Sequence, residues 1–158
     1  MKNIILLGNG PSRKYYKKSQ TPVAGFNFCE EEVDYKFVSD NSVRSDNCIR
    51  LPKKEFGYNK GILLAWNTGH AAYSYLRGQG FDSFDFFGFD LMWENTWDSE
   101  TDKVKNKDSW VIQANNAGLR DHWNSYWSTI IDVPTRIHLP SGESLNFHNK
   151  HIRLQHYE

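Results

Sequence analysis

The sequence has few cysteines, no net charge and no long apolar run. Its two cysteines, Cys29 and Cys48, form no metal-binding or redox motif, so we expect reduced thiols, with one disulfide as the alternative. Nineteen lysines and arginines balance nineteen aspartates and glutamates, which argues against a nucleic-acid partner drawn in by a strong positive field. No stretch approaches the ~20 consecutive apolar residues of a transmembrane helix. We therefore expect a cytoplasmic protein with no transmembrane segment.

Aromatic side chains are abundant instead. Phenylalanine, tyrosine and tryptophan make up 15% of the 158 residues, and all hydrophobic residues together make up 39%. This apolar content is too high for a disordered chain, and the length suits one folded domain. Composition leaves open whether the rings fill a small core or line a binding pocket.

The first predicted strand runs directly into a glycine-rich turn. Residues 4–7 are all apolar, as in a strand buried on both faces, and Gly8-Asn9-Gly10-Pro11-Ser12 follows them. The two glycines permit a tight turn, and Pro11 suits the start of a short, charged helix over residues 13–18. A strand, such a turn and a helix are typical of the start of an α/β nucleotide-binding unit. The turn lacks the third glycine of a dinucleotide fingerprint and the lysine of a P-loop, which disfavours dehydrogenase and P-loop kinase chemistry.

Strand and helix patterns alternate along the rest of the chain. Helical spacing of apolar residues predicts one helix that Asn67 or Thr68 caps and Gly78 ends, and another over residues 119–130. Further strands are predicted over residues 23–28, 35–39, 49–51, 84–89 and 135–139, the last of the sheet. This alternation predicts a single Rossmann-like α/β domain over residues 1–145, with a mainly parallel sheet and helices on both faces. The charge-dense segment 94–109 suits a lid, and residues 146–158 suit a C-terminal tail.

Small polar residues follow several of the predicted strands. The carboxyl ends of parallel strands share one edge of a sheet, where ligands bind in a crevice. Amide, hydroxyl and carboxylate groups there can bind a ribose or a base, and helix N-termini offer N–H groups to a phosphate. Each of these residue types is also common in turns, which is the alternative for any one of them. The predicted nucleotide-binding residues are Gly8, Asn9, Gly10, Ser12, Asn27, Asp40, Asn41, Thr68, Gly69, His70 and Trp93.

Separate blocks of the sequence resemble one known family. Gly8-Asn9-Gly10-Pro11-Ser12 after a strand is similar to the opening of the bacterial lipooligosaccharide-type sialyltransferases, and hydroxymethylpterin-diphosphokinase-like domains open in much the same way. The segment Asn67-Thr68-Gly69-His70-Ala71-Ala72, a helix, Gly80-Phe81 and Phe86-Phe87-Gly88-Phe89-Asp90 looks like the family's Ser-Gly, helix, Gly-Tyr, strand, Gly-Ile-Asp pattern. Leu139-Pro140-Ser141 is a third, shorter match. The resemblance implies a GT-A-like variant of the Rossmann-like fold, a CMP-linked sugar donor, and no metal or other cofactor.

The same resemblance implies roles for particular residues. Asn9 and Asn27 match asparagines that contact the nucleotide, and Asp40 or Asn41 matches a third contact. Thr68 matches a serine at the start of the helix. Asp90 matches the aspartate at the end of the following strand.

The chain departs from the family's pattern at two places that bear on catalysis. Met92 and Trp93 stand where the family has tyrosines that help the phosphate to leave, and of these two only Trp93 can donate a hydrogen bond. Asn115 or Asn116 stands at the position of the catalytic histidine, and an asparagine cannot act as a base.

Glycosyl transfer needs a base for the acceptor hydroxyl and a group that stabilises the departing phosphate. His122, the nearest histidine after the predicted lid, is the candidate base, with a surface position as the alternative. Asp90 is a second candidate base, and its alternative is a purely structural role in a loop. His70 is the candidate phosphate contact, and its alternative is capping or packing at the helix start.

We therefore expect a compact glycosyltransferase-like protein whose partner is a nucleotide or a nucleotide sugar. Its most concrete form is sialyltransferase-like, metal-independent transfer from a CMP-linked sugar. The alternatives are a nucleotide-binding or nucleotide-sequestering protein without catalysis, and a diphosphokinase-like enzyme.

Overall fold

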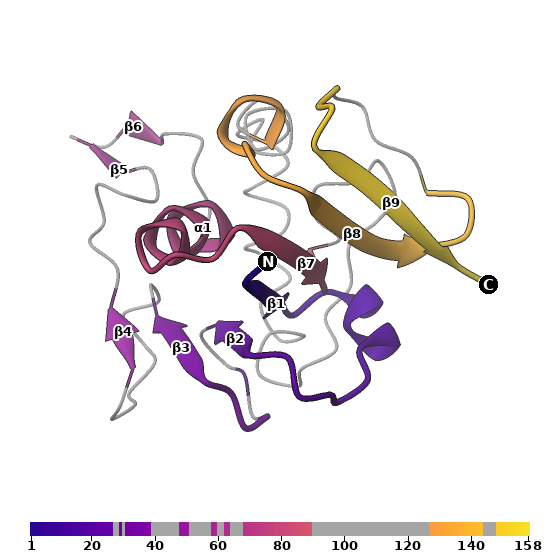
Figure 1. Cartoon of the computed structure of the whole chain (residues 1–158), viewed down its shortest axis with the longest axis horizontal. Helices are drawn as coiled ribbons and strands as arrows, with labels where there is room; N and C mark the ends of the chain where they lie inside the picture. The colour runs from indigo at the N-terminus through magenta and orange to yellow at the C-terminus, as the bar shows by residue number, and fades with distance from the viewer. Residues whose placement is uncertain are drawn as a thin grey trace.

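The computed structural model describes residues 1–26, 29, 31–38, 48–50, 58–59, 62–63, 68–89, 127–143 and 148–158, with the backbone alone at 58–59, 62–63 and 68. These residues form a seven-stranded sheet and a separate two-stranded one (Figure 1). The large sheet contains β1 (Asn3–Leu7), β2 (Val23–Phe26), β3 (Tyr35–Val38), β4 (Ile49–Arg50), β7 (Ser83–Phe87), β8 (Thr135–Pro140) and β9 (Ile152–Tyr157). The small sheet pairs β5 (Tyr58–Asn59) with β6 (Ile62–Leu63).

The strand order makes the large sheet doubly wound and Rossmann-like. Across the sheet the strands run β4-β3-β2-β1-β7-β8-β9, and each neighbouring pair is parallel. From β1 the chain moves outward to β4, returns on the other side of β1 as β7, and continues outward to β9. The strand order therefore reverses between β1 and β7. This confirms the prediction of an α/β protein built on a parallel sheet.

Alternate residues of β1 supply two cores, one on each face of the sheet. Ile4 and Leu6 belong to the larger core, which α1 (Thr68–Gly78) and the helical residues 127–130 help to cover. Ile5 and Leu7 belong to a smaller core on the other face, next to η1, a 3-10 helix (Pro11–Tyr15). Figure 1 shows α1 and η1 on opposite sides of the row of strands. Burial on both faces explains why residues 4–7 are apolar without interruption.

Aromatic rings fill the larger core. Phe37, Phe84 and Phe86 are fully buried, and Phe86 packs edge-on against Trp127 with ring centroids 4.5 Å apart. Within the described part of the chain, Met1 and Tyr75 are the large hydrophobic residues that are exposed. The described rings therefore serve mainly to pack the sheet against its helices.

Residues 135–139 form a strand, β8, as predicted, but the prediction that it is the last strand of the sheet is wrong. Strand β9, in the segment predicted as a C-terminal tail, pairs with β8 over its whole length and is the edge of the sheet. Its residues alternate between half-buried and exposed positions, so the exposed Arg153 and Gln155 give the segment the composition of a solvated tail.

The predicted helix over residues 13–18 is also wrong in extent and type. It begins at Pro11, the expected first helical position, but is a five-residue 3-10 helix that ends at Tyr15. Tyr16 then turns to an extended conformation (φ −66°, ψ 132°), and its ring packs edge-on against Phe87 on the sheet. Tyr15 and Tyr16 both pack against the smaller core, and this packing ends the helix early.

Candidate functional site

The candidate site lies at the carboxyl ends of β1 and β7, where the strand order reverses. In open α/β sheets, ligands bind in the crevice outside the carboxyl ends of the strands at this point. Residues 8–12 follow β1, and Gly88 and Phe89 follow β7. The loops that follow β1 and β7, which are about 75 residues apart in the chain, therefore meet at one edge of the sheet because β1 pairs with β7.

The two loops are in direct backbone contact. The Gly8 amide donates to the Phe87 carbonyl and the Gly10 amide donates to the Gly88 carbonyl, each over 2.7 Å. A Cβ atom at Gly8 would lie 2.5 Å from the Gly88 carbonyl oxygen, and Gly88 has a φ of +79°. Both positions thus require glycine, Gly8 for the close approach and Gly88 for its left-handed backbone as well. The close approach at Gly8 is thus to the neighbouring loop.

Ser12 links the same two loops through its side chain. Its fully buried hydroxyl accepts a hydrogen bond of 2.8 Å from the Gly88 amide. Gly10, with an extended backbone (φ −76°, ψ 167°), precedes the first residue of η1. The roles of Ser12 and Gly10 in nucleotide binding stay predictions.

Asn9 joins the loop after β1 to the end of β2. Its Oδ1 accepts a hydrogen bond of 2.7 Å from Arg13 Nη1, and its Nδ2 donates to the Phe26 carbonyl over 3.3 Å. Asn9 is half-buried, whereas Gly8 and Gly10 on either side are buried. Asn9 is therefore the residue of 8–10 that is exposed to solvent on one side.

Arg13 is a buried cation at the same edge of the sheet. Its Nε donates to Glu31 Oε1 over 3.1 Å, and its Nη2 also pairs with the other Glu31 oxygen. Nη2 lies 3.6 Å from the sulfur of Cys29, whose thiol donates to Glu31 over 3.4 Å. Burial raises the pKa of the Cys29 thiol, and the charge of Arg13 only partly opposes that shift. Cys29 and Cys48 are both free thiols, as the sequence analysis expected.

His70, in the first turn of α1, is fully buried. Its ring lies edge-on to Trp127 with centroids 4.7 Å apart, and burial lowers its pKa to about 3. The imidazole is therefore neutral at physiological pH, and these contacts are those of the packing role. A phosphate contact by His70 stays a prediction. Gly69 is buried beside it, and Thr68 begins the helix.

Several predicted site residues fall outside the described residues. These are the two candidate bases His122 and Asp90, the whole predicted lid over residues 94–109, and the predicted nucleotide contacts Asn27, Asp40, Asn41 and Trp93.

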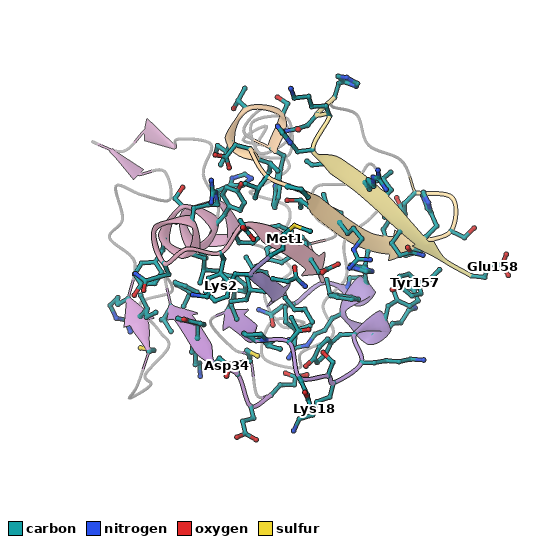
Figure 2. All side chains as sticks on the ribbon, in the orientation of Figure 1. Met1, Lys2, Lys18, Asp34, Tyr157 and Glu158 are labelled. Atoms are coloured by element: carbon teal, nitrogen blue, oxygen red, sulfur yellow. The ribbon has the colours of Figure 1, made fainter. Side chains whose placement is uncertain are left out.

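Three polar side chains that were not predicted from the sequence form a hydrogen-bonded chain across β7, β8 and β9. His138 Nε2 lies 2.8 Å from Asp85 Oδ1, and His138 Nδ1 lies 2.8 Å from the Tyr157 hydroxyl. The His138 ring stacks on Phe87 with centroids 3.8 Å apart, and Tyr157 stacks on Tyr15 of η1 at 4.3 Å. Figure 2 shows Tyr157 at the end of β9, beside the η1 ribbon. These contacts tie the edge strand to the loop that begins the candidate site.

Asp85 lies at one end of these three hydrogen-bonded side chains and has further partners. Besides His138, it accepts a hydrogen bond of 3.1 Å from Asn3 Nδ2 and forms an ion pair of 3.0 Å with Arg136. Burial acts to raise the pKa of Asp85, but the hydrogen bonds from His138 and Asn3 and the charge of Arg136 outweigh it, so the pKa is lowered. Because an ionised carboxylate can only accept, His138 Nε2 donates in its hydrogen bond to Asp85. A charged residue inside the apolar segment Phe84–Phe87 was the signal in the sequence.

Comparisons with known proteins find no relative of this chain. No protein-family model, no curated protein and no solved structure matches the chain. The fold and the position of the site define a Rossmann-like α/β protein. In the part that the structure describes, no three His, Cys, Asp or Glu side chains are grouped to hold a metal ion. None of the described helices is long and apolar enough to cross a membrane.

Proposed function

We propose that this protein binds a nucleotide, most concretely a CMP-linked sugar, at the carboxyl ends of β1 and β7. The observation that carries the proposal is that residues 8–12 and the turn at Gly88 meet where the order of the parallel strands reverses. Binding at this position is the general behaviour of open α/β sheets. The backbone contacts between the two loops hold this edge in a fixed shape, which lowers the entropic cost of binding.

Two side chains at this edge have the chemistry that a nucleotide needs. The carboxamide of Asn9 suits a ribose hydroxyl or a phosphate oxygen, because it contains both donors and an acceptor. Arg13, whose Nη1 lies 2.7 Å from Asn9 Oδ1, is a second such side chain, because a guanidinium binds anions, and in the free protein it is paired with Glu31. Hydrogen bonds from Arg13 and to the Phe26 carbonyl hold the Asn9 side chain in its position.

Glycosyl transfer is the finer part of the proposal, and the resemblance to the sialyltransferase-type family supports it. In this scheme the base is His122 or Asp90, the transfer uses no metal, and the protein has a GT-A-like variant of the fold. The departures at Asn115 or Asn116 and at Met92 favour the alternative that the protein binds or sequesters a nucleotide without catalysis.

Calorimetric titration of the full chain with CMP, other nucleoside monophosphates and CMP-linked sugars tests the proposal. We expect saturable binding of a cytidine nucleotide, because the resemblance implies that donor. Slow hydrolysis of a bound CMP-sugar, followed by release of CMP, would support the transferase, since a glycosyltransferase commonly loses some donor to water. Binding with no hydrolysis would support the non-catalytic alternative, and no binding of any nucleotide would contradict the proposal.

A further inference from the structure

Arg13 and Glu31 form an ion pair in which the cation is buried and the anion is half-exposed. Only 7% of the Arg13 side chain is exposed, whereas 45% of the Glu31 side chain is exposed. A buried charge needs a partner, because the hydration it has lost is expensive. The half-exposed carboxylate of Glu31 remains partly hydrated, and it regains the rest of its hydration when it separates from Arg13.

The other ion pairs in the described part of the chain lack this arrangement. In the pair between Arg136 and Asp85 the burial is reversed, with 58% of the arginine and 7% of the aspartate side chain exposed. In the pair between Arg77 and Asp132 both side chains are more open, at 33% and 59%. Of these pairs, the one at Arg13 therefore combines a buried cation with a replaceable anion.

The position of this pair relates it to the candidate site. Arg13 Nη1 donates to Asn9 Oδ1 over 2.7 Å and reaches the Gly8 carbonyl at 3.5 Å, so the guanidinium lies against the loop after β1. Its Nε and Nη2 face Glu31, from the segment that follows β2. One side of the guanidinium thus contacts the loop after β1, and the other side contacts the carboxylate of Glu31, a solvent-exposed residue.

We propose that Glu31 occupies a phosphate site on Arg13, and that a phosphate group of the ligand displaces the Glu31 carboxylate. The proposal rests on the proposed function, because it names the residue that takes the phosphate of the bound nucleotide and the residue that competes with it. A guanidinium binds a carboxylate and a phosphate in the same two-point geometry. A phosphate monoester such as CMP carries about −1.5 to −2 charges and offers three acceptor oxygens, so it is a stronger partner for Arg13 than a carboxylate. The phosphate of a CMP-linked sugar is a diester with one negative charge, so it matches the charge of the Glu31 carboxylate and competes with it less strongly than CMP does. Throughout the exchange, Nη1 continues to hold Asn9 in the loop.

The exchange makes Glu31 an internal competitor of the ligand. While the Glu31 carboxylate pairs with Arg13, the phosphate site is closed. The apparent affinity for the ligand is therefore the intrinsic affinity multiplied by the fraction of time that the site is open. Removal of the carboxylate charge therefore strengthens binding, which is the opposite of what loss of a structural ion pair does.

The test compares Glu31→Gln with Glu32→Gln in the full chain, using inorganic phosphate and CMP as probes. Glu32 is the exposed neighbour, so its variant removes the same charge without touching the pair. We expect Glu31→Gln to lower the apparent Kd for both probes about tenfold, because the site is then open all the time. Glu31→Asp, which retains the charge on a shorter side chain, is expected to fall between the wild type and Glu31→Gln. Unchanged affinity in Glu31→Gln would overturn the proposal.

Arg13→Lys gives the second arm. Lysine retains the charge but loses the two-point geometry, so we expect a Kd about tenfold higher for both probes. Lys17→Gln removes an exposed cation close by in the sequence and should leave the Kd unchanged. Equal losses in the two variants would show general electrostatic attraction and overturn the proposal.

The outcomes separate this proposal from the proposed function. If CMP binds the wild type and Glu31→Gln binds it no better, the phosphate site on Arg13 is wrong and nucleotide binding stands. If phosphate binds more tightly to Glu31→Gln while no nucleotide binds any variant, the phosphate site stands and nucleotide binding is wrong.

Discussion

Gly8 and Gly88 lie so close together that neither can carry a side chain. A Cβ atom at Gly8 would approach the Gly88 carbonyl oxygen to 2.5 Å, and Gly88 has a left-handed backbone with φ +79°. The contact closes the gap between the loops that follow β1 and β7. It fixes the shape of the edge at which we propose that a nucleotide binds.

Gly8→Ala should therefore destabilise the fold. We expect a loss of about 1–3 kcal/mol in the free energy of unfolding, since the added methyl group forces two backbone segments apart. Gly78→Ala is the matched control, because no atom lies within 4 Å of a Cβ atom at that residue. It should be neutral or slightly stabilising. Urea denaturation of both variants measures the difference, and equal stabilities would show that the loops are not in contact.

Asn9→Ala should weaken nucleotide binding by about 1–3 kcal/mol, the cost of leaving a desolvated partner unpaired. Because the carboxamide also bonds Arg13 and the Phe26 carbonyl, we expect some loss of folding stability as well. Gln20→Ala is the control, since it removes an exposed amide that precedes β2, at the other edge of the sheet. Calorimetry on Asn9→Gly decides whether the side chain is needed: full affinity in that variant would remove Asn9 from the site.

The hydrogen bonds that join Asp85, His138 and Tyr157 should contribute to the stability of the edge strand. Tyr157→Phe removes one hydrogen bond and should cost about 1 kcal/mol. Asp85→Ala should cost about 1–3 kcal/mol, because it leaves the buried His138 Nε2 and the half-buried Asn3 amide without their acceptor. Tyr75→Phe removes an exposed hydroxyl and should stay within about 0.5 kcal/mol of the wild type. If Tyr157→Phe and Tyr75→Phe are equally stable, the contact between Tyr157 and His138 has no energetic role.

Stability should fall as the pH falls below about 6.5, and His70 should account for part of this slope. Its pKa is about 3 in the folded protein, where burial excludes the charged form, against 6.5 for an ordinary histidine. The unfolded chain therefore takes up a proton below pH 6.5 while the folded chain does not, which costs up to about 1.4 kcal/mol per pH unit. Denaturation at pH 7, 6 and 5 should show a shallower slope for His70→Gln than for the wild type. Equal slopes in His70→Gln and the wild type would contradict the burial of His70.

The central strands and the parallel sheet could be predicted from the sequence because their signal is local. A run such as residues 4–7, apolar on both faces, occurs where a strand is covered on both sides. The edge strand β9 gave no such signal, since half of its side chains face water. The same composition suits an edge strand and a solvated tail, and pairing with β8 decides between them.

The place of residues 8–12 at the carboxyl edge of the sheet could be predicted from the sequence, whereas the contacts that they make could not. The turn at residues 8–12 identified the edge of the sheet, because glycine and asparagine are required there for local reasons. The approach of Gly8 to Gly88 and the contact of His138 with Asp85 depend on the register between strands. These partners are far apart in the sequence, so the contacts of Gly88 and His138 emerge only from the folded chain.

The most direct test of the account is the map of amide chemical-shift changes when the ¹⁵N-labelled full chain is titrated with CMP. We predict the largest changes at Gly8, Asn9, Gly10 and Gly88, at the carboxyl ends of β1 and β7. Lys2 and Asp82, which bond each other at the amino edge of the sheet, should remain unchanged. Changes centred on Lys2 and Asp82, or no saturable change at all, would contradict nucleotide binding at the point where the strand order reverses.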